Sequence, residues 1–149
     1  MLVVFLDIDG VMVPAVAWKP VELLEDGFLS FNKTAIKSLS RIIRETGASI
    51  VLMSTHKSKY NIDQWERIFI SRGISTSINK LNDNSLGLNR RDEILTWLSN
   101  NLVEKFVIID DDKSLNELPD KVKSKLVLTS SLVGLNDECA DVAIQVLKS

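Results

Sequence analysis

Two aspartates, Asp7 and Asp9, lie within "VVFLDIDGVMV", one of the most apolar stretches of the chain. Burying a carboxylate costs several kcal/mol unless it is paired, hydrogen-bonded or bound to a metal. Three more acids, Asp110 to Asp112, directly follow the apolar run "KFVII". Clusters of oxygen ligands suit a hard cation, and Mg²⁺ is usually held by a few carboxylates together with waters and a substrate phosphate. The sequence therefore predicts a Mg²⁺ site.

The spacing of Asp7 and Asp9 predicts separate roles for the two carboxylates. Positions i and i+2 of a strand point the same way, but Gly10 lets the chain turn, so the second side chain can take a different position. One carboxylate can then attack while the other shuttles a proton. The tetrapeptide "DIDG" also begins calcium loops, but the twelfth loop position would be Trp18, where a bidentate acid is required. A calcium loop is therefore excluded.

The elements that position these acids alternate between strands and helices. Solid apolar runs predict strands at 2–6, 49–53 and 105–109, with shorter strands at 74–78 and 126–128. Apolar residues at helical spacing follow four asparagines that can cap helices, and glycines can end the first two of these helices. The asparagines are Asn32, Asn61, Asn89 and Asn136, and the glycines are Gly47 and Gly73. This alternation predicts an α/β fold, a three-layer sandwich around a mostly parallel, Rossmann-like sheet.

Ligands of such sheets bind beyond the carboxyl ends of the strands, which is where the polar clusters fall. Asp7 and Asp9 end the first predicted strand, Ser54 and Thr55 the second, and the triple aspartate the strand at 105–109. Each cluster alone has a structural explanation as a turn or a helix cap. Their order along the chain, each after its own strand, favours one shared site.

Composition narrows the function classes. The chain has 149 residues, 45% of them hydrophobic, and a formal net charge of −2, which suits one domain spanning residues 1–149 and excludes a global basic field. The single cysteine, Cys139, cannot form an internal disulfide. The apolar N-terminus lacks a basic leader, and no run approaches the ~20 apolar residues of a membrane span. We expect a soluble, cytoplasmic protein with no membrane partner.

Four segments of the chain resemble the ordered motifs of the haloacid-dehalogenase (HAD)-like phosphohydrolases: "FLDIDGV", "VLMS", an arginine opening "RRDEILTWL", and "VIIDDD". The resemblance spans residues 3–112. It is closest to the small HAD domains of RNA-repair polyproteins of the Swiss Army Knife type, which carry an "R..EI..WL" and "DDD" pattern. His56 and Lys57 stand where those domains have "WR" after the second motif.

The resemblance implies a phosphatase mechanism with an aspartyl-phosphate intermediate. Asp7 is implied as the nucleophile, and Asp9 as the acid that protonates the leaving oxygen and then activates water. The implied Mg²⁺ ligands are the Asp7 side chain, the Asp9 backbone carbonyl and an acid of the fourth motif. For that acid Asp111 is preferred, Asp110 lies close by, and Asp112 comes last.

The resemblance also implies residues that hold the phosphoryl group. Ser54 would hydrogen-bond a phosphoryl oxygen, with Thr55 as the second choice. An arginine at the start of the third-motif helix would stabilise the negative charge of the phosphoryl group, and Arg90 matches the spacing better than Arg91.

The spacing of the motifs leaves no room for a cap domain. Asp9 and Ser54 are separated by 44 residues and Ser54 and Arg90 by 35, which the predicted helices and strands largely use, so residues 10–31 can form only a flap. An open site admits a phosphate on a macromolecule, which favours a nucleic-acid end or a phosphoprotein as substrate. Trp18 in the flap can stack on a substrate ring or anchor the loop, and His56 is a candidate substrate contact. The alternative function is a weak or inactive module that binds phosphate or protein.

Overall fold

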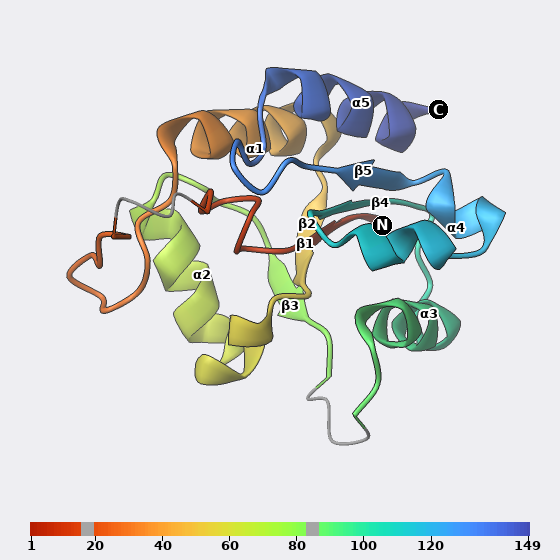
Figure 1. The fold of residues 1–149 in the computed structure, drawn as a ribbon, viewed down its shortest axis with the longest axis horizontal. Helices are drawn as coiled ribbons and strands as arrows, with labels where there is room; N and C mark the ends of the chain where they lie inside the picture. Colours follow the sequence, from red (N-terminus) through yellow and green to blue (C-terminus); the bar gives the residue numbers. More distant parts are fainter. Residues whose placement is uncertain (16–19, 83–86) are drawn as a thin grey trace.

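The computed structural model describes residues 1–15, 20–82 and 87–149, so Trp18 lies outside the described residues. Five parallel strands form one sheet in the order β3-β2-β1-β4-β5 (Figure 1). The strands are β1 (Leu2–Leu6), β2 (Ser49–Leu52), β3 (Ile78–Lys80), β4 (Lys105–Asp110) and β5 (Leu126–Leu128). The sheet confirms the predicted Rossmann-like α/β fold.

Helices cover both faces of this sheet. Buried side chains of α1 (Lys33–Thr46), α2 (Ile62–Ser71) and α5 (Asp137–Lys148) pack on the face that carries Val4, Leu6 and Ile50. Figure 1 shows α1 and α5 side by side along this face. The opposite face packs on α3 (Arg90–Asn100) and the 3₁₀ helix η2 (Lys113–Glu117), and α4 (Asp120–Lys123) follows η2. These are the three predicted layers.

Local capping explains where the long helices begin. Each predicted asparagine precedes the first residue of its helix and accepts a hydrogen bond from a backbone N–H of the first turn, satisfying a donor that the helix leaves unpaired. At the other end of α1, Gly47 has the left-handed conformation, with φ of 70°, that a helix C-cap favours. The four predicted helix starts are confirmed.

The predicted strand at 74–78 is displaced in the structure, where β3 begins only at Ile78. Gly73 and Ile74 instead complete the C-terminal end of α2. Gly73 adopts φ of 85°, and the backbone N–H groups of Gly73 and Ile74 donate to the carbonyls of Ile70 and Phe69, respectively. These two bonds form a Schellman motif, which keeps Ile74 in the helix terminus and out of the sheet. The apolar side chain of Ile74 is buried all the same, which explains the strand-like pattern.

The sheet order places a topological switch point beside β1. The chain passes from β1 to β2 on one side, whereas β4 pairs with the other side of β1. Crevices at such points are the usual ligand sites of open parallel sheets. In the described part of the chain, residues 10–15 and 20–31 form only short bridges and turns before α1, so no cap domain follows β1. Among the described residues, no helix is long and apolar enough to cross a membrane.

Candidate functional site

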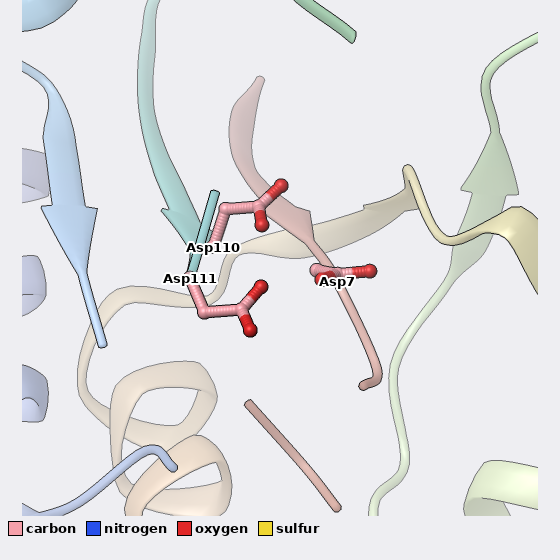
Figure 2. A group of neighbouring side chains, drawn as sticks. All are labelled: Asp7, Asp110 and Asp111. Atoms are coloured by element: carbon pink, nitrogen blue, oxygen red, sulfur yellow. The ribbon is translucent and has the colours of Figure 1, made fainter. Parts of the chain in front are cut away.

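Three carboxylates meet at the switch point. Asp7 follows the last residue of β1, Asp110 ends β4, and Asp111 is the next residue. One oxygen from each lies within 4.8 Å of the other two. Figure 2 shows the three side chains gathered where β1 and β4 end. Backbone pairing holds them there, because the N–H of Asp7 donates to Ile109 of β4 at 3.1 Å. Sheet register therefore brings together acids that are about a hundred residues apart.

Arg90 is the cation of this cluster. It is the first residue of α3, and its Nη1 lies 2.6 Å from Oδ2 of Asp110 and 3.4 Å from Oδ1 of Asp7. The neighbouring Arg91 is more exposed and lies 3.9 Å from Asp92. Because successive residues of a helix point about 100° apart, only Arg90 of this pair reaches the acids. The structure thus places Arg90, the arginine preferred from the motif spacing, beside the acids, and its role at a phosphoryl group stays a prediction.

The cluster sets three acids against one cation, Arg90. Burial, and then the neighbouring Asp110, raise the pKa of Asp7 to about 8, and Arg90 offsets this only in part. Burial also raises the pKa of Asp110, against the opposing effect of Arg90. Burial disfavours the charged form of Arg90, but the carboxylates of Asp110 and Asp7 outweigh it and raise the pKa of the guanidinium. A divalent cation bound here would relieve the repulsion between the acids.

Asp110 and Asp111 differ in how free their oxygens are. Asp110 is fully buried; its Oδ1 accepts from the backbone N–H of Asp112 at 3.0 Å and its Oδ2 from Arg90. Asp111 is half-buried, and within the described ranges its carboxylate has no hydrogen bond or ion pair. Asp112 instead caps η2 by accepting from the N–H of Ser114. Asp111 is thus the fourth-motif acid with oxygens available to a ligand.

Gly10 leaves the space that Asp111 fills. It has φ of +79°, and a Cβ at this position would lie 2.0 Å from Oδ2 of Asp111. Any larger residue would therefore displace this carboxylate. The donor set is entirely oxygen, it sets three acids against one cation, and its space is kept by a glycine, so these residues fit a hard cation such as Mg²⁺. Asp7 and Asp111 are the side chains best able to hold the cation, and the neighbouring Asp110 completes the acidic cluster.

Ser54 and Thr55 follow the carboxyl end of β2, the strand that pairs with β1. Ser54 is fully buried and caps the 3₁₀ helix η1 (Thr55–Lys59), where its Oγ accepts from the backbone N–H of His56 at 3.1 Å. Within the described residues its own hydroxyl proton has no acceptor, so it is available to a bound phosphoryl oxygen. Thr55 is exposed. Ser54 therefore combines a fixed position with a free donor.

Asp9 points away from the three-acid cluster. Its side chain is 59% exposed, and its Oδ2 accepts a hydrogen bond from Nε2 of His56 at 2.9 Å. The separation from Asp7 follows from the turn after β1, where the N–H of Gly10 donates to Val13. The two aspartates thus occupy the distinct environments that the sequence predicts. His56 contacts Asp9, and its role as a substrate contact stays a prediction.

Two further contacts that link elements around the site were not apparent from the sequence. Lys57 is buried, and its Nζ lies 3.2 Å from Oε2 of Glu93, an ion pair that joins η1 to the first turn of α3. Thr129 follows β5. Its hydroxyl donates to the backbone carbonyl of Gly10 at 2.8 Å, and its backbone N–H donates to the backbone carbonyl of Asp110. The only sequence signal for Thr129 is that it, too, is a polar residue at the carboxyl end of a predicted strand.

Comparison with known families agrees with this geometry. A family model described as the HAD domain in Swiss Army Knife RNA repair proteins matches residues 3–140, which reaches from β1 into α5. The match therefore extends past the four motifs and covers the elements that complete the sheet. It confirms the resemblance drawn from the motifs. A search of the curated proteins finds no match to the chain.

Proposed function

The chain belongs to the HAD domains of Swiss Army Knife RNA repair proteins, and on that basis we propose that it is a Mg²⁺-dependent phosphomonoesterase acting through an aspartyl-phosphate on Asp7. The observation that carries the proposal is the convergence of Asp7, Asp110 and Asp111 within 4.8 Å, with Arg90 against them. A buried ion pair alone needs one acid for one cation. Two further carboxylates at the same point are a cost to the fold that a catalytic site explains.

Asp7 is the nucleophile in this proposal. Its carboxylate oxygen attacks phosphorus and forms an acyl phosphate as the bond to the leaving oxygen breaks. Arg90 already lies 3.4 Å from Oδ1 of Asp7, so its guanidinium is positioned to neutralise the phosphoryl oxygens beside the nucleophile. The hydroxyl of Ser54 donates to another phosphoryl oxygen. Asp7, Asp111 and the backbone carbonyl of Asp9 would hold Mg²⁺, which when bound supplies positive charge and orients the phosphoryl group.

Asp9 performs the proton transfers. Its carboxyl gives a proton to the leaving oxygen in the first step, and its carboxylate then takes one from the water that hydrolyses the aspartyl-phosphate. An exposed position suits this task, because the group must exchange protons with leaving group and water in turn. Asp7, in contrast, is buried, which suits a group that must attack without a hydration shell.

The substrate class follows from the open site and from the family. Since no cap domain covers the carboxyl edge in the described part of the chain, we propose that the phosphate is presented on a macromolecule. The family's description names RNA repair proteins, which supports a phosphorylated RNA end over a phosphoprotein.

The test is phosphate release from 4-nitrophenyl phosphate, from phosphorylated RNA oligonucleotides and from phosphopeptides. We expect activity with Mg²⁺, none after EDTA, and none in Asp7→Asn, which keeps the shape of the side chain but not its nucleophile. Unchanged turnover in Asp7→Asn would refute the mechanism. Binding of Mg²⁺ and phosphate with no turnover of any ester would instead favour the binding module. Hydrolysis of phosphopeptides but not RNA ends would overturn the substrate class alone.

A further inference from the structure

The carboxylate of Asp9 is largely surrounded by solvent but is held by one side chain. Nε2 of His56, the second residue of η1, lies 2.9 Å from Oδ2 of Asp9. It is the donor of this hydrogen bond when Asp9 is ionised, because a carboxylate can only accept. No other side chain among the described residues bonds the Asp9 carboxylate. An exposed aspartate otherwise moves between rotamers, and fixing its direction matters only if the carboxyl must meet a particular atom.

The imidazole of His56 is largely enclosed by the protein. Its residue donates a backbone N–H to Oγ of Ser54, and only 16% of the side chain is exposed. The ring packs edge-to-face against Phe28 of the flap, with centroids 5.3 Å apart. Phe28 is buried and contacts Trp65 of α2 in the same geometry at 5.1 Å. His56 therefore has little freedom to swing away from Asp9.

The flap residue behind the ring is tied down by a buried cation. The guanidinium of Arg72 donates to the backbone carbonyls of Phe28 and Leu29 and forms two hydrogen bonds to Asp26, of 2.6 and 3.2 Å. Asp26 in turn accepts from the N–H of Phe28 at 3.0 Å. These contacts link the end of α2, through the flap, to the ring that holds Asp9.

We propose that His56 is a positioning residue that orients the acid–base carboxyl of Asp9, a role that rests on the proposed function. A donor on Oδ2 favours Oδ1 as the oxygen that carries the transferable proton, because a proton on Oδ2 would face another N–H. His56 thus selects both the rotamer and the reacting oxygen. Its loss reduces proton donation to the leaving group and leaves the nucleophile, Arg90 and the metal-binding acids in place.

The test compares two leaving groups in rapid-quench measurements of phosphoenzyme formation with Mg²⁺. The 4-nitrophenolate of 4-nitrophenyl phosphate departs without an acid, whereas the alkoxide of glycerol 2-phosphate needs a proton to leave. His56→Phe keeps a ring against Phe28 and removes the donor, and we expect it to slow formation from glycerol 2-phosphate about tenfold, the effect of one hydrogen bond to a charged group, with little change for the aryl ester. His56→Gln restores an N–H at similar reach and should recover most of the rate.

A double variant separates positioning from a general loss of structure. If His56 acts through Asp9, His56→Phe should add no further slowing in an Asp9→Asn background. Equal slowing of both esters, additive effects in the double variant, or no recovery in His56→Gln would each overturn the role of His56. No phosphoenzyme in the unaltered protein would overturn the proposed function, and this role with it. Thermal unfolding of both single variants checks that they fold.

Discussion

Replacing Asp7 by asparagine should abolish activity and yet stabilise the metal-free fold. Asp7 is almost wholly buried beside Asp110, and the two share one cation, Arg90. Asparagine keeps the shape and cannot ionise, so the Arg90–Asp110 pair remains, and the folded protein pays neither for repulsion at this position nor for protonating it. The same substitution therefore acts in opposite directions on function and on stability.

The sign of the pH dependence follows from the pKa of Asp7, which is raised from 3.8 to about 8. A carboxyl with a raised pKa in the folded state contributes stability that is fully present below its unfolded value and is lost as pH rises through the folded value. The free energy of unfolding of the unaltered protein should therefore fall, relative to Asp7→Asn, between about pH 4 and pH 8. Protonating an ordinary carboxyl at pH 7 costs about 4 kcal/mol, so we expect Asp7→Asn to be more stable there by roughly 2–4 kcal/mol.

The assay is urea unfolding in EDTA at several pH values between 4 and 9, with Glu25→Gln as the control for loss of one exposed carboxylate. Adding Mg²⁺ should reverse the order, because the ion stabilises the folded state to which it binds, and Asp7→Asn binds it more weakly. An Asp7→Asn protein that is less stable at pH 7 in EDTA, or a difference that does not grow with pH, would refute the charge argument.

Two further predictions concern the glycine beside the acids and the flap. Gly10→Ala should weaken Mg²⁺ binding by about 10–100-fold in calorimetric titration, because its Cβ displaces Asp111; Gly27→Ala, with similar φ but open space around its Cβ, should not. Arg72 lowers the pKa of Asp26 to about 2 through hydrogen bonds, so Asp26→Asn should lose about 1 kcal/mol of stability at neutral pH, a value reduced by solvent screening. That loss should vanish as pH falls from about 4 through about 2. The measurement is the free energy of unfolding of both proteins against pH, and a difference between them that stays constant over this range would contradict the prediction.

Much of the fold could be predicted because its signals are local. Asn32 and Gly47 delimit α1 through bonds that span only a few residues, and the solid apolar runs at β1, β2 and β4 need no knowledge of their partners. The error at β3 has the same origin. Ile74 is buried in either arrangement, and only the hydrogen bonds that end α2 decide that it does not belong to the strand.

The sequence by itself determined the family of the chain through its four motifs, and oxygen ligands at the ends of parallel strands sufficed to predict a cation site. The tertiary structure decided which of the candidate side chains lie together. Arg90 reaches the acids and Arg91 does not, and among the described residues the oxygens of Asp111 have no partner whereas both oxygens of Asp110 accept a hydrogen bond. His56 contacts Asp9 across 47 positions of the sequence. Such contacts depend on how the crossovers pack against the sheet, a long-range property that no local periodicity encodes.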